Sequence, residues 1–270
     1  MSNMQQRILT GAAGIVLVVG LLYASQWGYF LLFGALMVLC QWEFYQLLFK
    51  DGNAPLKVYG TICGATLFLL SFFIEQGALH SKFYVLLFPV MAIVYFIKLY
   101  KRNEVKPFTN IGLTYLGIIY TALPFALLNL AVFSSGVYRF QLVMGMLLLL
   151  WASDTGAYFA GVRYGRTKLF ERVSPKKSWE GSIGGAIASG TTAAILSFFF
   201  TAVNPIHWVL LAIIMVVAGT YGDLVESLFK RSIAIKDSGS AIPGHGGFLD
   251  RFDGLLISAP FVAALFKLWP

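Results

Sequence analysis

In the stretch "MGMLLLLWASD" (residues 144–154), ten residues without charge lead directly into an aspartate. The stretch belongs to an apolar run over residues 141–163, and a helix needs about 20 such residues to cross a bilayer. The rest of the chain has the same character, because 58% of its 270 residues are hydrophobic and only 12% are charged. That charged fraction is about half that of a soluble domain. The sequence therefore predicts an all-α, polytopic membrane protein.

Similar apolar runs lie on both sides of this stretch and predict about nine transmembrane helices. We place the spans near residues 8–24, 28–49, 57–76, 83–99, 110–133, 141–163, 182–203, 208–231 and 252–268. The first run has no signal-peptide cleavage site after it, so we expect it to remain as a helix. If the N-terminus is cytoplasmic, only Lys82, Arg139 and Lys267 of the 20 basic residues lie outside. This agreement with the positive-inside rule supports an odd number of helices.

Polar residues gather after residue 150, which divides the chain into two regions. We expect about five N-terminal transmembrane helices in residues 1–140. Residues 141–270 should form a catalytic transmembrane region with cytoplasmic loops at 164–181 and 232–251. The two cysteines, Cys40 and Cys63, fall inside apolar runs, so we expect buried thiols and no disulfide framework.

The first polar region begins inside a predicted helix. A carboxylate at the depth of Asp154 costs about 2.5–3.5 kcal/mol unless it is paired, hydrated or metal-bound, so we expect a polar cavity to reach it. The loop that follows, "VRYGRTKLFERVSPKKSWEG" (residues 162–181), mixes basic residues with glycines. Cations and free backbone N–H groups before a helix suit a polyphosphate. A solvated basic loop facing lipid headgroups is the alternative interpretation.

The second polar region starts near the end of the eighth span. If that helix continues through Arg231, Asp223 and Ser227 share a face with Lys230 or Arg231, and Glu226 pairs with Lys230 on an adjacent stripe. The segment "KDSGSAIPGHGGFLDRFDG" (residues 236–254) follows, and its proline and glycines predict a tight loop that lets backbone approach a ligand. Its histidine, His245, suits either a structural hydrogen bond or substrate binding.

The carboxylates of these regions indicate a metal. Asp250 and Asp253 start the last span, and the hard oxygen ligands, with no cysteine site, favour Mg²⁺ or a similar ion over zinc. Carboxylates from two helices beside clustered lysines and arginines are what phosphoryl or nucleotidyl transfer needs. The chain has no G-x-x-x-x-G-K-[ST] phosphate loop and no nucleophile elbow.

The run from Ser227 to Asp253 resembles the family pattern of phosphatidate cytidylyltransferases, also called CDP-diacylglycerol synthases, at all 27 positions. The stretch from Asp154 to Gly181 is similar to the second region that the family shares, with Ser178 where a threonine is common. Residues 1 to about 140 match the family only as a set of apolar helices.

The resemblance implies an enzyme, a magnesium-dependent nucleotidyltransferase that transfers CMP from CTP to phosphatidic acid. It places the active site on the cytoplasmic side of a bacterial inner membrane and implies a homodimer and no nucleic-acid partner. It leaves open whether a second metal or a monovalent cation is needed. The metal ligands are expected to be Asp223 and Asp250, with Asp154 and Asp253 as second-tier candidates. The expected catalytic residues are Lys230, Arg231, Lys236 and Asp237. The expected contacts to CTP and the lipid phosphate are Lys176, Lys177, Glu180, Ser227, His245 and Arg251. We also expect the lipid to reach the site laterally, between helices near Asp154.

Two other functions fit parts of the pattern. A transporter or scramblase of anionic lipids would also bury carboxylates and line a path with cations, but it predicts broken helices in two symmetric halves. A different lipid enzyme, such as a CDP-alcohol phosphotransferase or a polyprenol kinase, would share the metal and the membrane site. The alcohol phosphotransferases resemble a D-x-x-D-G-x-x-A-R pattern that this chain lacks.

Overall fold

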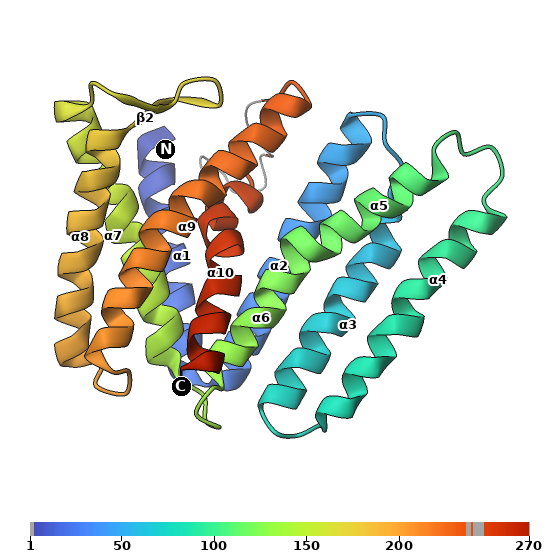
Figure 1. Ribbon diagram of the computed structural model, residues 1–270, viewed down its shortest axis with the longest axis horizontal. Helices are drawn as coiled ribbons and strands as arrows, with labels where there is room; N and C mark the ends of the chain where they lie inside the picture. Colours follow the sequence, from blue (N-terminus) through green and yellow to red (C-terminus); the bar gives the residue numbers. More distant parts are fainter. Residues whose placement is uncertain (1–2, 236–238, 240–245, 270) are drawn as a thin grey trace.

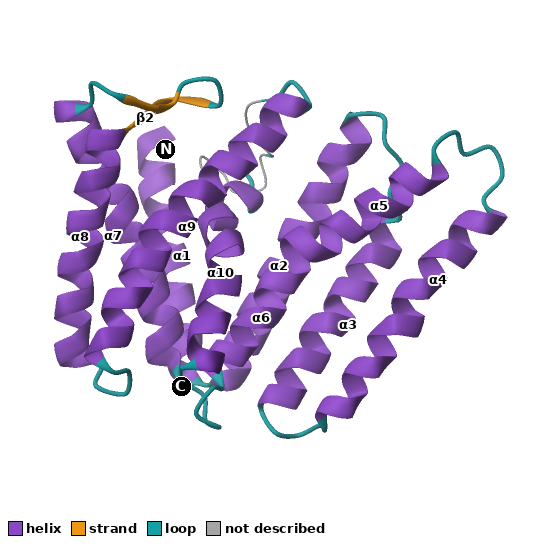
Figure 2. Ribbon diagram, viewed as in Figure 1, coloured by secondary structure: helices purple, strands orange, loops and turns teal. Residues whose placement is uncertain are grey.

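The computed structural model describes residues 3–235, 239 and 246–269, with side chains from residue 11 onward, and it is almost entirely helical (Figure 2). One pair and one set of three neighbouring elements run on without a break, so the described residues form nine helical passes. The elements are α1 (Asn3–Ala24), α2 (Gln26–Lys50), α3 (Lys57–Glu75), η1 (Ser81–Leu86) with α4 (Leu87–Tyr100), α5 (Pro107–Gly117) with η2 (Ile118–Ala122) and α6 (Leu123–Val132), α7 (Phe140–Tyr164), α8 (Trp179–Phe199), α9 (Pro205–Ser232) and α10 (Leu249–Leu268).

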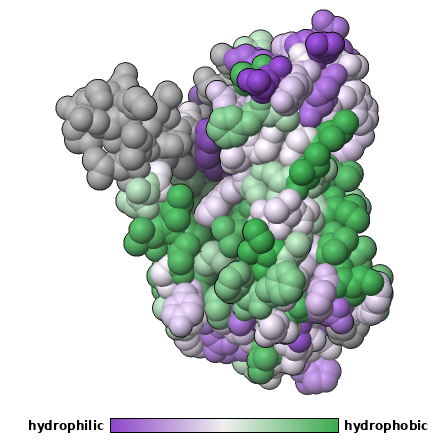
Figure 3. All heavy atoms as spheres, turned by 90° about the vertical axis from the view of Figure 1, so that its left-hand side faces the viewer, coloured by the Kyte–Doolittle hydropathy of each residue, from purple (hydrophilic) through white to green (hydrophobic). Residues whose placement is uncertain are grey.

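The predicted polytopic membrane bundle is confirmed. Seven of the nine passes are long and apolar enough to cross a bilayer, counting only described residues. The other two are α1, whose described side chains start at Gly11, and α10, which carries four charged residues. An apolar band separates two more polar ends of the molecule (Figure 3), as a bilayer requires.

The nine passes put the chain termini at opposite ends of the bundle (Figure 1). The end at the top of that view carries the N-terminus, the α2–α3 and α4–α5 loops, the end of α9 and the start of α10. We call it the hairpin end, after the β-hairpin that precedes α8. The opposite end carries the C-terminus. Lys82 in η1, Arg139 before α7 and Lys267 in the last turn of α10 belong to this opposite end, as the charge pattern predicts.

A short antiparallel hairpin precedes α8, where the sequence predicts only a basic turn. It consists of β1 (Lys168–Phe170) and β2 (Ser174–Ser178). The Glu180 carboxylate closes its base by accepting hydrogen bonds from the backbone N–H groups of Arg166 and Thr167, each at 3.1 Å. The Ser178 hydroxyl accepts a bond from Gly181 N at 3.1 Å and caps α8, an interaction that satisfies one of the unpaired N–H groups of the first turn.

The N-terminal helices are held by aromatic packing and buried polar bonds. Tyr29 on α2 is buried, and its hydroxyl donates to Asn129 Oδ1 on α6 at 2.8 Å. At the hairpin end, Lys98 is buried and bonds to Glu104 and to the Ala54 carbonyl, which ties the α4–α5 loop to the α2–α3 loop. Burial raises the pKa of Glu104, but hydrogen bonds from Lys98 and Asn110 outweigh it and hold that pKa below its ordinary value.

Glycines set the distance between the helices that carry the polar residues. A Cβ atom on Gly222 of α9 would lie 2.4 Å from the Asp253 carbonyl oxygen of α10, and one on Gly254 would lie 3.4 Å from Gly219 Cα. Small residues allow such close helix crossings in membranes. The α9–α10 crossing therefore depends on glycine at position 222, whereas the contact of Gly254 with Gly219 is at an ordinary van der Waals distance. The predicted buried, unpaired thiols of Cys40 and Cys63 are also found.

Candidate active site

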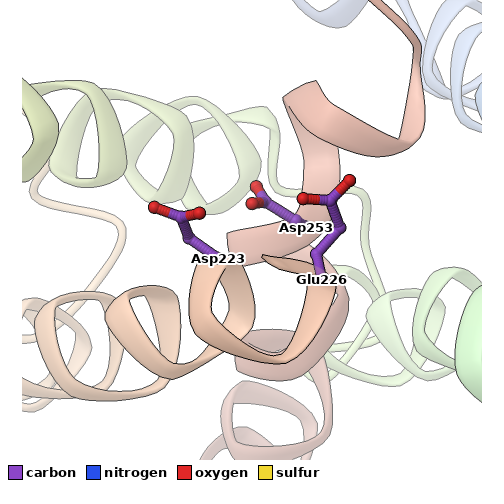
Figure 4. A group of neighbouring side chains, drawn as sticks. All are labelled: Asp223, Glu226 and Asp253. Carbon is purple, nitrogen blue, oxygen red and sulfur yellow. The ribbon is translucent and has the colours of Figure 1, made fainter. Parts of the chain in front are cut away.

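Three carboxylates meet where α9 and α10 cross (Figure 4). Asp223 and Glu226 lie on α9 and Asp253 lies on α10, and each offers an oxygen within 4.8 Å of the others. Glu226 is buried, whereas Asp223 and Asp253 are half-buried. We call these three residues the acidic cluster.

The local structure explains why these side chains converge. Asp223 and Glu226 are three residues apart on a helix, so they share a face. Gly222 lets the first turns of α10 pack directly against that face, which sets Asp253 opposite. The Asp253 carboxylate also accepts a hydrogen bond from Gly254 N at 2.7 Å.

Two lysines bind different carboxylates of the acidic cluster. Lys177, on β2, lies 2.5 Å from Asp223 Oδ2 and donates to the Thr220 carbonyl at 3.4 Å. Lys230, on α9, lies 2.5 Å from Glu226 Oε2 and 2.7 Å from Asp250 Oδ1. The Glu226–Lys230 pair that the helical spacing predicts is thus present. The hairpin and both helices meet at one charged site.

Asp250 lies beside the acidic cluster and not within it. Its Oδ1 binds Lys230, and its Oδ2 accepts a hydrogen bond from Gly247 N at 3.1 Å. Gly246 adopts a φ of +83°, and a Cβ atom there would lie 2.9 Å from the Asp250 carboxylate, so the chain needs glycine at this turn. The sequence assigns the primary metal role to Asp223 and Asp250, and the structure groups Asp223 with Glu226 and Asp253.

Asp154 approaches the site from α7. Its side chain is exposed, and the charges of Lys177, Asp223 and Arg251 all act on it. The structure thus places Asp154 among the charges of the site, and the polar cavity expected to reach it stays a prediction. Among the described residues Asp154 is not one of the three grouped carboxylates.

The other predicted site residues fall into three groups. Ser227 donates to Asp223 Oδ1 at 3.3 Å and so supports the acidic cluster directly. Arg231 donates to the Ile235 carbonyl at 3.1 Å, and Glu180 closes the hairpin. Both contacts favour positioning roles. Lys176 and Arg251 have exposed side chains at the hairpin end. Lys236, Asp237 and His245 lie outside the described residues.

Sequence reasoning gave Glu226 only as the partner of Lys230 and not as a site residue. It missed a second residue, Glu43 on α2, altogether. Its side chain is buried, and its Oε2 accepts a hydrogen bond from Phe248 N at 2.8 Å. A Cβ atom on Gly239 would lie 3.4 Å from the same carboxyl group. One feature of the sequence could have identified it, because Glu43 is the lone carboxylate within the apolar span 28–49. An ionisable residue inside a membrane span is a functional candidate.

The acidic cluster fits a hard divalent cation. All its donors are carboxylate oxygens, which Mg²⁺ and Ca²⁺ prefer. Glu226 Oε1 is buried and accepts no hydrogen bond from any residue that the structure describes. An unpaired buried carboxylate oxygen is costly, and a bound cation would satisfy it.

Comparison with known proteins identifies the family of the chain. The model of the cytidylyltransferase family matches residues 5–269. The phosphatidate cytidylyltransferase of Bacillus subtilis (strain 168) is 32% identical over 277 aligned positions, which cover all of both chains. Those of Haemophilus influenzae and Staphylococcus haemolyticus are 42% and 47% identical over 159 and 120 positions. These two alignments cover 51% and 44% of this chain and 54% and 46% of the relatives. Because the match extends from the first helix to the last, the chain belongs to the cytidylyltransferase family.

Proposed function

We propose that this protein is a phosphatidate cytidylyltransferase, which transfers CMP from CTP to phosphatidic acid. The relationship to the Bacillus subtilis enzyme over the full length of both chains carries the proposal. The site supports it, because three carboxylates and two lysines meet at the polar end of a membrane bundle. A soluble nucleotide and a membrane lipid both have access to such a position.

The reaction places few demands on the protein. An oxygen of the lipid phosphate attacks the α-phosphorus of CTP and forms the new O–P bond. The bond from that phosphorus to the bridging oxygen breaks, and pyrophosphate leaves with the electron pair. The attacking phosphate monoester is already anionic at neutral pH, so no strong general base is needed. Catalysis then depends on aligning the two substrates and on neutralising the negative charge of their phosphates.

The two lysines suit that task. Lys230 is held between Glu226 and Asp250, and Lys177 is held against Asp223. Each ammonium group is fixed in place before substrate binds. It therefore needs little rearrangement to stabilise the negative charge that develops on the phosphates. The exposed Lys176 on the hairpin extends the positive surface toward the triphosphate.

The cofactor we propose is Mg²⁺. Asp223, Glu226 and Asp253 are the residues that would hold it, and the cation would supply neutralisation of the phosphate oxygens when bound. We also propose that the hairpin end faces the cytoplasm of a bacterial inner membrane, since 17 of the 20 basic residues then obey the positive-inside rule. A homodimer is proposed on the family resemblance alone.

The test is transfer of label to lipid. Purified protein is incubated with CTP labelled at the α-phosphate and with phosphatidic acid and Mg²⁺, and the lipid phase is counted with and without EDTA. We expect label in the lipid only when phosphatidic acid is present, and its loss with EDTA. A folded sample that moves no label into lipid would refute the activity and favour a lipid transporter. Transfer that persists in EDTA would refute the metal requirement.

A further inference from the structure

An apolar cavity lies directly beside the acidic cluster, in the membrane part of the bundle. It has a volume of about 290 Å³ and is lined by residues of α1, α2, α7 and the start of α10. Its walls are almost wholly hydrophobic. They include Gly14, Val18, Leu36, Leu150 and Phe252.

Along α1 the cavity extends over about two helical turns. On α1 its lining runs from Gly11 to Val18, which corresponds to about 10 Å at 1.5 Å per residue. Phe248 and Arg251, at the start of α10, also line the cavity. The cavity therefore leads from the charged site into the hydrocarbon region.

The first helix forms the outer wall and is anchored mainly at its far end. Leu22 is fully buried, and its carbonyl accepts a hydrogen bond from Tyr138 at 2.9 Å. Nearer the N-terminus the side chains of Ile15, Val16 and Leu17 are at least half exposed. A Cβ atom on Gly14 would meet nothing within 4 Å. This half of α1 stands away from the bundle and leaves the cavity open toward lipid.

The polar end of the cavity has the charge of an anion site. Arg251 lines the cavity, has an exposed side chain and lies in the same helical turn as Asp250 and Asp253. A guanidinium group binds phosphate with good geometry. Asp154 lies one turn along α7 from Trp151, another lining residue. A lipid with its phosphate at Arg251 would thus place that phosphate at the reaction site and one chain in the cavity.

We propose that this cavity binds one acyl chain of the phosphatidate substrate, with α1 as the movable wall through which the lipid arrives. The inference rests on the proposed function and adds to it a chain-binding site. It predicts that catalysis depends on acyl-chain length through residues of α1, which carries none of the charged residues of the site.

The experiment fills the cavity from α1. Gly14→Leu adds a side chain at a position that lines the cavity, where a Cβ atom meets nothing within 4 Å. Leucine also favours helix more than glycine does. Gly20→Leu is the matched control, because it lies on the same helix, its Cβ also meets nothing within 4 Å, and it does not line the cavity. Initial rates are measured in mixed micelles with dioleoyl phosphatidate, with dibutyryl phosphatidate and with varied CTP.

We expect Gly14→Leu to raise KM for dioleoyl phosphatidate about tenfold, the effect of excluding about two methylene groups from burial. KM for CTP and for the dibutyryl lipid should stay within about twofold, and Gly20→Leu should match the wild type. A phosphatidate analogue with a photoreactive group in mid-chain should also crosslink to residues 11–18.

Two results would overturn the proposal. One is an unchanged KM for the dioleoyl lipid in Gly14→Leu, and the other is an equal loss in both variants, which would indicate a general effect on α1. Failure of the proposed function is distinguishable, because the wild type would then transfer no label to either lipid. The crosslink would still show whether a chain occupies the cavity.

Discussion

Glu43 and Phe248 are joined by a hydrogen bond of 2.8 Å between a side chain of the second helix and the backbone just before the last. The bond links positions 205 residues apart. It fixes the start of α10, two residues before Asp250 and five before Asp253. The N-terminal helices thus contribute to the site and do more than anchor it in the membrane.

This bond leads to a prediction about Glu43. Glu43→Ala should lower kcat at least tenfold, because a hydrogen bond to a charged group contributes about 1.5–3 kcal/mol and its loss frees the first turn of α10. Glu43→Gln keeps an oxygen that accepts the Phe248 N–H, so its kcat should stay within about threefold of the wild type. Both are measured at saturating CTP and phosphatidate. An alanine variant as active as the wild type would remove Glu43 from the site.

The acidic cluster predicts a specific metal dependence. Asp223→Asn, Glu226→Gln and Asp253→Asn should each abolish turnover or raise the Mg²⁺ concentration for half-maximal activity at least tenfold, because each removes a carboxylate ligand. Glu75→Gln is the control, since Glu75 pairs with Lys267 at the opposite end of the bundle. Activity is titrated against Mg²⁺ for each variant. Unshifted Mg²⁺ curves at normal rates in all three would contradict the assignment.

The two neighbouring lysines of the hairpin should differ in effect. Lys177 binds Asp223, whereas Lys176 is exposed. Lys177→Ala should lower kcat at least tenfold, since it removes a cation next to the reacting phosphate. Lys176→Ala should mainly raise KM for CTP. Steady-state kinetics with varied CTP separate the effect on kcat from the effect on KM. Identical kcat and KM values in the two variants would contradict different roles for these lysines.

The close crossing of α9 and α10 at Gly222 predicts a loss of stability when that glycine is replaced. Gly222→Ala forces α9 and α10 apart, because its Cβ would lie 2.4 Å from the Asp253 carbonyl, and overpacking of this kind costs about 1–3 kcal/mol. Gly190→Ala on α8 meets nothing within 4 Å and serves as the control. Thermal unfolding in detergent should show a lower Tm for Gly222→Ala alone. Equal Tm values would mean that the crossing tolerates a methyl group.

Much of the fold could be predicted from the sequence because apolar run length alone determines a membrane span. The Glu226–Lys230 pair could be predicted as well, since helical spacing fixes it. The hairpin could not, because residues 168–178 show no clear alternation of polar and apolar side chains. The sequence could not show which of Asp250 and Asp253 joins the acidic cluster, because that depends on the rotation of α10 against α9. Glycine contacts between the two helices set this rotation. Glu43 meets the site only through tertiary packing.

The most direct test of the central claim compares two labels in one reaction. CTP labelled at the α-phosphate and CTP labelled at the γ-phosphate are each incubated with the protein, phosphatidic acid and Mg²⁺. If the site transfers CMP, the α-label enters the lipid and the γ-label appears in pyrophosphate. A γ-label in the lipid would show phosphoryl transfer instead, and no label in the lipid from either nucleotide would contradict the account.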